Sequence, residues 1–392
     1  MAKKQKFHSL TGRIDIRLMR EAFKAVKRNR GAAGIDKVSI QMFEQNLEEN
    51  LIALMKDLKT RGTFVPKPSR RAWIAKDPKR TKFRPLGIPA VRDRVAQEVL
   101  RRLLEPIFEP LFHDCSFGFR PKRNCHAAIR QVLKFHSDGY RITLDADIAG
   151  FFDNIPHKLI VDFIAEEVAD GNILDLIKRF LAAGVLENGI FKPTTIGTPQ
   201  GGVISPLLAN IVLNKLDWRL ELAGYRFVRY ADDFVVVCQT REQATAALTL
   251  VQTVMTELGL SLSPEKTKIA SYWKGYDFLG FRLSKRSRTM RAKSLEKFKT
   301  KIRELTRRHY NLEPEVIEKL NQVIRGTANY FATEFSTCIG MFQQLDKWIR
   351  MRVRCMKYKR KWSNDNYRMT KRVFQKKLGL LELLNFTTTT MG

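Results

Sequence analysis

The chain has 392 residues, 44% of them hydrophobic and 10% aromatic, a composition that predicts two or three globular domains and excludes a disordered polymer. Its 71 Lys and Arg exceed its 40 Asp and Glu, and the resulting charge of +31 is spread along the whole sequence. Such a charge repels itself unless a polyanion neutralises it, and nucleic acid is the usual polyanion.

The N-terminal third predicts helices interrupted by one basic hairpin. Residues 15 to 60 carry apolar residues at helical spacing, as in "LEENLIALMKDL", with a glycine-punctuated loop at "GAAGIDKVSI". Residues 62 to 94 are Pro-rich, strongly basic and strand-like in short pieces, which predicts a β-hairpin carrying charge over a groove. Residues 95 to 135 predict helix again, broken at Pro106 and Pro110.

The pattern of the residues after 140 predicts an α/β layer followed by a helical region. Strand and helix signals alternate from residue 140 to 240. Residues 290 to 390 are basic and helical in pattern, with no β-rich stretch. The coarse plan is therefore a basic N-terminal region, a central α/β layer and a basic helical C-terminal region.

One acidic stretch lies in "YRITLDADIAGFFDNIPH", residues 140 to 157. Its residues alternate between an apolar face (Ile142, Leu144, Ala146, Ile148) and a polar face (Arg141, Thr143, Asp145, Asp147). Asp147 therefore projects near the end of a strand, before a turn at Ala149 and Gly150. The aromatic pair Phe151 and Phe152 follows, and one of the two is expected in the core. Standing alone, the stretch equally fits an edge strand with a solvated acidic face.

A second acidic stretch is "RYADDFVVVC", residues 229 to 238, which predicts a hairpin with Asp232 and Asp233 at its tip. An Asp-Asp pair is more often a solvated turn than a site. If this hairpin neighbours the strand of Asp147, however, three carboxylates meet. Such a cluster can hold two Mg²⁺ ions about 3.5–4 Å apart, the arrangement used in phosphoryl transfer.

Between the two stretches lies "TIGTPQGGVISPLLANIVLNKLD", residues 195 to 217. Its glycines, Gly197, Gly201 and Gly202, predict a loop whose backbone approaches a ligand closely, before a helix that begins near Val203. An ordinary glycine loop before an amphipathic helix has the same pattern.

These motifs, in this order and spacing, resemble the polymerase motifs of reverse transcriptases. More narrowly they resemble the bacterial group II intron-encoded (maturase) type, in its endonuclease-lacking form because no Cys-rich or His-rich tail follows. The resemblance spans about residues 10 to 380. The motifs that carry it are "GAAGID", "FRPLGIPAVRDRVAQ", "SFGFRPKRNCHAAI", "LDADIAGFFDNIPH", "IGTPQGGVISPLLANIVLNKLD", "FVRYADDFVVV", "LSLSPEKTKI", "YDFLGFRL", "WIRMRVRCMKYKRKW" and "KKLGLL".

The resemblance implies a right-hand polymerase of the α/β (α+β) class. Its fingers and palm, with an antiparallel palm sheet, precede an all-helical thumb/X domain. Residues 1–104 are expected to form the N-terminal extension and fingers, and residues 105–287 the catalytic palm with the remaining fingers elements. Residues 288–392 are expected to form the thumb/maturase X-like domain.

It also implies roles for individual residues. Asp147, Asp232 and Asp233 are the expected metal-binding and catalytic carboxylates, with the Ile148 backbone carbonyl as a further ligand, and Lys266 is the expected general acid for leaving pyrophosphate. The expected nucleotide-binding residues are Arg84, Lys82 (with Arg80 as the alternative), Ala149, Gln200, Gly201 and Phe152. Of the two adjacent aromatic residues, Phe152 rather than Phe151 is the expected steric gate, which rejects a ribose 2′-hydroxyl. The expected nucleic-acid contacts are Phe278, Leu279, Gly280, Arg120, Lys357, Lys359 and Arg360. Asp145 and Asp153 are expected to be structural.

The implied function is RNA-directed DNA polymerisation by two-metal nucleotidyl transfer, with two Mg²⁺ ions or Mn²⁺ in their place. The expected partners are an RNA template, a DNA or RNA primer or target DNA, and dNTPs, together with structured intron RNA whose splicing and retrohoming the protein aids. Two alternatives are a splicing cofactor without significant polymerisation and a host-recruited or antiphage reverse transcriptase. A viral-type RNA polymerase is disfavoured by the bulky aromatic after Asp147.

The expected location is the cytoplasm, in a nucleoid-associated ribonucleoprotein and without membrane contact. No apolar run approaches the ~18 residues of a membrane-spanning helix, and the N-terminus lacks the apolar segment of a signal peptide. The five cysteines include no C-x-x-C pair, which disfavours structural zinc and a disulfide framework.

Overall fold

The computed structural model describes residues 6–387 except 76–80, 82, 199–200 and 360–367. The described residues divide into two compact units, residues 6–269 and residues 270–387, each with its own buried core. No helix in this part of the chain is both long and apolar enough to cross a membrane.

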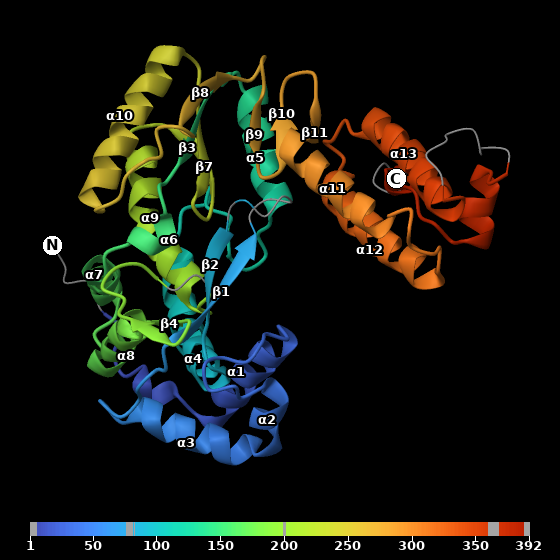
Figure 1. Ribbon diagram of the computed structural model, residues 1–392. Coiled ribbons are helices and arrows are strands. Elements are labelled where there is room, and N and C mark those ends of the chain that lie inside the picture. Colours follow the sequence, from blue (N-terminus) through green and yellow to red (C-terminus); the bar gives the residue numbers. More distant parts are fainter. Residues whose placement is uncertain (1–5, 76–80, 82, 199–200, 360–367, 388–392) are drawn as a thin grey trace. The chain divides into compact units, whose positions relative to one another are not determined.

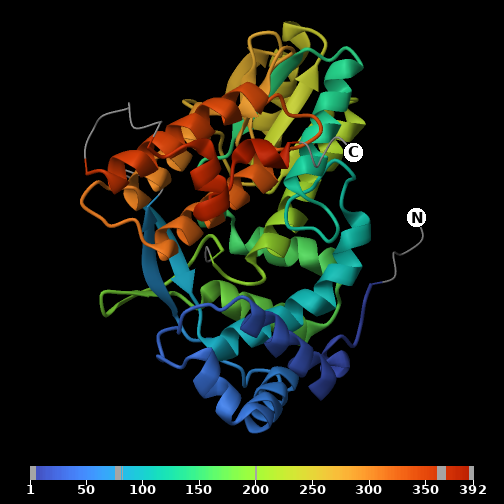
Figure 2. The same ribbon diagram turned by 90° about the vertical axis from the view of Figure 1, so that its right-hand side faces the viewer.

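Helices form the N-terminal end of the first unit, as the apolar spacing predicts (blue in Figure 2). The first of them begins where the Asp15 side chain accepts a hydrogen bond from the backbone N–H of Leu18, a typical N-cap. The other helices bury their apolar stripes against the long helix α4. The helices are α1 (Ile16–Arg28), α2 (Ile40–Gln45), α3 (Leu47–Lys59) and α4 (Val91–Phe108).

Helix α4 continues through Pro106, where the sequence predicted a break. The helix is buried on most of its surface, so its packing offsets the one hydrogen bond that the proline nitrogen cannot donate. It ends at Phe108, and a single 3₁₀ turn, Glu109–Leu111, carries Pro110. The predicted break is therefore wrong at Pro106, and the helix ends just before Pro110.

The predicted basic hairpin is confirmed as β1 (Ser69–Ala75) and β2 (Phe83–Ile88), which pair antiparallel. Strand β1 also pairs in parallel with β4 (Val185–Glu187), which pairs antiparallel with β5 (Ile190–Lys192). These strands form one sheet in the order β2-β1-β4-β5. Helices α7 (His157–Glu167) and α8 (Gly171–Ala182) precede β4 in the chain.

The central sheet has the order β6-β7-β3-β8, with β3 antiparallel to β7 and β7 antiparallel to β6. Helices α9 and α10 pack on one face and α5 on the other (Figure 1). Leu144 and Ala146 of β3 are buried in the main core on the α9–α10 face, so the predicted apolar face is confirmed. Thr143 of the predicted polar face is buried as well, because β3 is an inner strand of the sheet. The elements are α5 (Cys125–Ser137), β3 (Ile142–Asp147), α6 (Phe151–Asn154), α9 (Ser205–Leu222), β6 (Arg226–Tyr230), β7 (Asp233–Cys238), α10 (Arg241–Glu257) and β8 (Lys268–Ser271).

The second unit combines a small antiparallel meander with helices. The ring of Phe281 in β10 lies 4.8 to 5.7 Å from the rings of Tyr330, Phe331 and Phe335, so the meander and α12 share one aromatic core. The elements are β9 (Tyr276–Phe278), β10 (Phe281–Leu283), β11 (Arg288–Met290), α11 (Ala292–Leu305), α12 (Pro314–Phe331) and α13 (Ile339–Lys357), followed by the helical turns Val373–Lys377 and Leu383–Phe386.

The observed fold is mixed α/β, with an antiparallel arrangement of β6, β7 and β3 as predicted. The prediction that residues from 288 onward are all helical is wrong, because β11 occupies Arg288–Met290. This strand is held by pairing with β10, a long-range contact that helical periodicity does not reveal. The predicted boundaries after residues 104 and 287 fall inside α4 and inside the second unit.

Candidate functional site

The strands that carry the acidic stretches are neighbours in the central sheet. Asp147, the last residue of β3, stands directly opposite Asp233, the first residue of β7. Side chains of directly opposite residues lie on the same face, with Cβ atoms about 4.5–5.5 Å apart. Because Tyr230 also pairs with Asp233, Ala231 and Asp232 form the two-residue tip of the β6–β7 hairpin. The predicted pairing of the two strands is therefore confirmed.

The carboxylates at this tip interact electrostatically. Burial raises the pKa of Asp232, and the negative charge of Asp147 raises this pKa further. The positive charges of Arg84 and Arg229 act in the opposite direction. Asp232 is half-buried, whereas Asp233 is exposed. A bound divalent cation would remove the repulsion between Asp147 and Asp232.

Lys266 contacts the first of these carboxylates directly. Its Nζ lies 2.8 Å from Oδ2 of Asp147, and both side chains are well exposed. In the described residues no three His, Cys, Asp or Glu side chains converge tightly enough to form a metal-ligand group. The donor chemistry nevertheless fits Mg²⁺, because the three carboxylates at the strand ends are hard oxygen ligands and two of them repel each other.

The backbone after Asp147 is tied to the segment 261–263. Ser263 N–H donates to the Asp147 carbonyl (2.7 Å) and Ala149 N–H donates to the Ser261 carbonyl (2.9 Å), around the bridge between Ile148 and Leu262. Carbonyls of successive residues in an extended strand point to opposite sides. The carbonyl of Ile148 is therefore expected to point away from this segment, and its role as a metal ligand stays a prediction.

The two aromatic residues after the turn have different environments. Phe151 is 2% exposed and belongs to the core, whereas Phe152 is only partly buried, with the ring centroids 5.3 Å apart. Both lie in the one-turn helix α6, which begins after Gly150 in a left-handed conformation (φ +54°). Phe152 is therefore the more accessible aromatic of the pair, and its predicted contact with a nucleotide stays a prediction.

The glycine loop packs closely against neighbouring backbone. A Cβ atom on Gly197 would lie 2.6 Å from the Asp153 carbonyl oxygen, and one on Gly201 would lie 2.4 Å from the Gly87 carbonyl oxygen. His157 Nε2 donates to the Gly197 carbonyl at 2.7 Å. The loop therefore runs between α6 and β2, while the predicted contact Gln200 lies outside the described residues.

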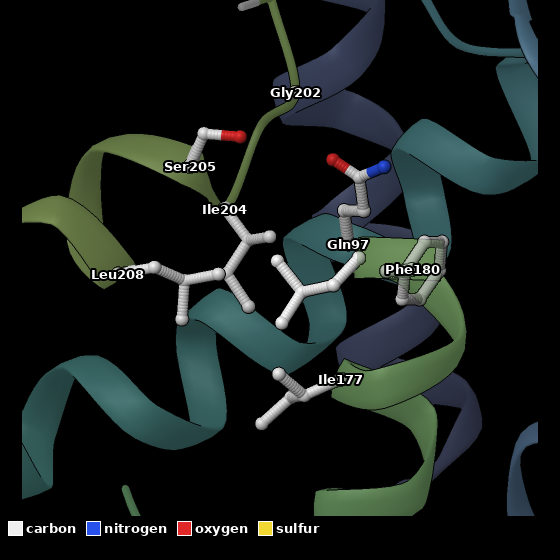
Figure 3. A pocket seen from close by; sticks show the side chains of 8 residues that line it. Gln97, Ile177, Phe180, Gly202, Ile204, Ser205 and Leu208 are labelled. Atoms are coloured by element: carbon white, nitrogen blue, oxygen red, sulfur yellow. The ribbon is translucent and has the colours of Figure 1, made fainter. Parts of the chain in front are cut away.

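Gln97 of α4 supports the start of α9. It is 5% exposed, and its Oε1 accepts a hydrogen bond from Val203 N–H at 2.7 Å. Figure 3 shows its side chain beside Gly202, Ile204 and Ser205, where it lines a small cavity with apolar side chains of α8 and α9. Gln97 was not among the predicted site residues, although a neutral polar residue on the buried face of a helix is a signal that could have identified it.

Of the basic residues predicted to bind the nucleotide, the structure describes only Arg84. Arg84 is exposed on β2, opposite Ile74 of β1, and its charge acts on Asp232. Lys82 and Arg80 lie outside the described residues.

Arg120 is a buried structural residue, so its predicted contact with nucleic acid is wrong. The side chain is 3% exposed. Its Nη1 donates to the carbonyls of His113 (2.6 Å) and Ser116 (2.8 Å), and its Nη2 lies 2.9 Å from the Glu109 carboxylate. The guanidinium organises the chain between residues 109 and 120.

Three of the predicted nucleic-acid contacts, Phe278, Leu279 and Gly280, lie in the second unit. Phe278 is buried in the core of the second unit, with 1% of its surface exposed, so the prediction that its side chain contacts nucleic acid is wrong. Leu279 (φ +45°) and Gly280 (φ +83°) form the turn between β9 and β10, and the Leu279 carbonyl accepts from the Tyr330 hydroxyl at 2.8 Å. This turn remains a predicted contact.

Two of the three predicted cations near the end of α13 are described. Lys357 is exposed at the last residue of the helix. Lys359 instead donates to the Tyr310 carbonyl and to Asn311 Oδ1 (3.1 Å). Arg360 lies outside the described residues.

Two family models match the chain. Residues 65–283 match the model described as reverse transcriptase (RNA-dependent DNA polymerase), and residues 295–378 match the group II intron, maturase-specific domain. The first match covers more than half of the chain and includes every carboxylate of the site.

Individual proteins are similar as well. Protein YkfC of Escherichia coli is 35% identical over 310 residues, which is 68% of this chain and 81% of that protein. The group II intron-encoded protein LtrA of Lactococcus lactis is 43% identical over 198 residues, 50% of this chain. The match spans only 32% of LtrA.

Proposed function

Because this chain belongs to the reverse transcriptase family, we propose that it copies RNA into DNA at the carboxylates where β3 and β7 end. The observation that carries this assignment is the strand register, which sets Asp147 opposite Asp233 with Asp232 next in the chain. Family membership supports RNA-directed DNA polymerase activity, and the maturase-specific segment supports a role in intron splicing.

The proposed ligands of two Mg²⁺ ions, or of Mn²⁺ in their place, are Asp147, Asp232, Asp233 and the carbonyl of Ile148. Ions held there would activate the primer 3′-hydroxyl and neutralise charge on the triphosphate of the incoming dNTP. In that transfer the 3′-hydroxyl would lose its proton to solvent, its oxygen would bond to the α-phosphorus, and the bond from this phosphorus to the leaving pyrophosphate would break.

Other residues around the carboxylates have distinct proposed tasks. Lys266, whose Nζ lies 2.8 Å from Oδ2 of Asp147, is the proposed donor of a proton to the departing pyrophosphate. Arg84 presents an exposed guanidinium, which can bind phosphate oxygens in a bidentate manner. Ala149 and Gly201 border the nucleotide through their backbone, and the ring of Phe152 excludes a ribose 2′-hydroxyl.

The finer architecture belongs to the same proposal. The β1–β2 hairpin and the N-terminal helices correspond to fingers, the β6-β7-β3-β8 sheet to the palm, and the helices after residue 291 to the thumb and maturase region. The primer would contact the Leu279–Gly280 turn of the second unit.

The test is primer extension on an RNA template with dNTPs or rNTPs, with and without Mg²⁺. We expect extension only with dNTPs and a divalent ion. Asp145→Asn is the matched control for substitution of the proposed metal ligands. Asp145 lies on the same face of β3 as Asp147 but forms an ion pair with Lys268. This variant should retain most of the rate. Equal extension without a divalent ion would contradict the assignment.

A second activity, binding of structured intron RNA, is favoured by the charge of the second unit. Residues 270–392 hold 28 Lys and Arg against 10 Asp and Glu. A surplus of this size supplies the non-specific part of RNA affinity. RNA binding and splicing that persist after loss of the carboxylates would support a separate splicing role, performed in a cytoplasmic ribonucleoprotein.

A further inference from the structure

A buried ion pair lies directly behind the hairpin tip that carries Asp232 and Asp233. Arg229 of β6 and Asp217 of α9 are both 0% exposed. Their contact is bidentate, with Nε to Oδ1 at 2.7 Å and Nη2 to Oδ2 at 2.5 Å. Sequence reasoning gave neither residue a role.

The remaining guanidinium nitrogen reaches the tip itself. Nη1 of Arg229 donates to Oδ1 of Asn210 (2.9 Å) and to the carbonyl oxygen of Ala231 (3.0 Å). Ala231 has a left-handed backbone (φ +58°), a conformation that a residue with a Cβ atom adopts only when its surroundings enforce it. It is the residue immediately before Asp232.

The segment 115–118 lies alongside β6 and reaches the tip. Its backbone pairs with Arg229, since Arg229 N–H donates to the Cys115 carbonyl (2.9 Å) and Phe117 N–H donates to the Arg229 carbonyl (2.8 Å). Gly118 is so close that a Cβ atom there would lie 2.2 Å from the Ala231 nitrogen. Asn210 Nδ2 donates to the Gly118 carbonyl at 2.8 Å and joins this segment to the ion pair.

We propose that Arg229, Asp217 and Asn210 are positioning residues that hold Ala231 in its left-handed conformation and thereby aim Asp232 and Asp233 at the metal ions. The inference rests on the proposed function of those carboxylates. An apolar pair of similar volume would serve stability as well as a buried ion pair, because burial of two charges carries a large desolvation cost. The feature that an apolar pair cannot supply is the set of directional hydrogen bonds to the tip.

The test replaces the ion pair by apolar side chains in the double variant Arg229→Met, Asp217→Leu. We expect its unfolding midpoint to stay within a few degrees of the unaltered protein, because no unpaired charge is left in the core. Half-saturating Mg²⁺ for primer extension should rise at least about fivefold and kcat should fall at least about tenfold, on the scale of other lost site preorganisation. Affinity for the primer–template duplex should stay within about twofold, because the altered residues are buried.

The matched control is Arg350→Met, Glu382→Leu, which removes a largely buried ion pair of the second unit. This control should leave half-saturating Mg²⁺ unchanged. If the Arg229 and Asp217 variant folds and extends primers with the same rate and Mg²⁺ dependence, the pair only stabilises the fold and the proposal is overturned.

Asn210→Leu, which has a similarly branched side chain and adds no charge, is the second test if the double variant does not fold. It removes the hydrogen bonds to Arg229 and to Gly118, so half-saturating Mg²⁺ should rise about threefold. An unchanged value would overturn the proposal.

Binding of Mn²⁺ without substrates, followed by electron paramagnetic resonance, separates this inference from the proposed function. Weaker Mn²⁺ binding in the network variants supports positioning even if no primer is extended, whereas equal binding contradicts it. Absence of extension by the unaltered protein would contradict the proposed polymerase function alone.

Discussion

The two units of the molecule use positive charge differently. In the first unit, residues 1–269 hold 43 Lys and Arg against 30 Asp and Glu, and two of the arginines, Arg229 and Arg120, are buried and bonded within the protein. In the second unit a smaller segment carries the larger surplus. Buried arginines such as these therefore fix geometry in the first unit, whereas the larger surplus of the second unit provides a field for a polyanion.

The sharpest way to break this comparison is to remove the carboxylates. Asp232→Asn with Asp233→Asn should lower primer extension at least about 1000-fold, because the ligands of the catalytic ions are lost. Affinity for RNA should remain within about twofold, since the basic surface is unaltered. Filter binding and primer extension on the same preparation measure both. Extension that survives would place the metal ions elsewhere.

A smaller effect is expected at the aromatic beside the site. Phe152→Val should reduce the preference for dNTPs over rNTPs at least about tenfold, because the ring that occupies the 2′ space is shortened. Single-nucleotide incorporation kinetics with matched dNTP and rNTP pairs provide the measurement. Phe151→Val is the matched control, and its core position predicts lower stability with unchanged sugar preference. The reverse pattern would move the gate to Phe151.

The comparison is sharpened in the second unit by two lysines near the end of α13. Lys357→Gln should weaken RNA binding a few-fold and reduce the slope of log affinity against log salt by about 0.7–0.9 if this exposed ammonium contacts a phosphate. Lys359→Gln should change the slope less, because its ammonium already donates to Tyr310 and Asn311. If both variants reduced the salt slope equally, the hydrogen bonds of Lys359 within the protein would not limit its contact with RNA, and this prediction would be wrong.

The smallest effect on activity is expected at His136. This buried histidine instead affects how the stability of the first unit depends on pH. Burial lowers its pKa to about 4, against 6.5 for an ordinary histidine. The unfolded chain therefore takes up a proton between these values, so stability is full above pH 6.5 and is lost as pH falls toward 4. We expect a loss of about 2 kcal/mol between pH 7 and pH 5. His136→Gln should remove this part of the pH dependence in denaturant titrations, and an unchanged dependence would contradict it.

The sequence predicts the parts of the site that depend on local pattern. Alternation places Asp147 at a strand end, and the continuous apolar run after Asp233 predicts a strand of the hairpin. Both hold, because the apolar side chains of β3 enter the main core and β7 is buried on both faces. It did not predict that Arg229 and Arg120 are internal, because each depends on a partner brought close by the fold, Asp217 or Glu109. In a chain this basic, a buried arginine has the same local signature as a surface one.

The most direct test of the central claim locates the divalent ion itself. Fe²⁺ in place of Mg²⁺, with ascorbate and peroxide, generates hydroxyl radicals that cut the backbone only near the bound ion. Cleavage should occur around residues 147 and 231–233 of the first unit and should disappear in the Asp232→Asn, Asp233→Asn variant. Cleavage elsewhere in the chain, or an identical pattern in this variant, would contradict a metal centre at the ends of β3 and β7.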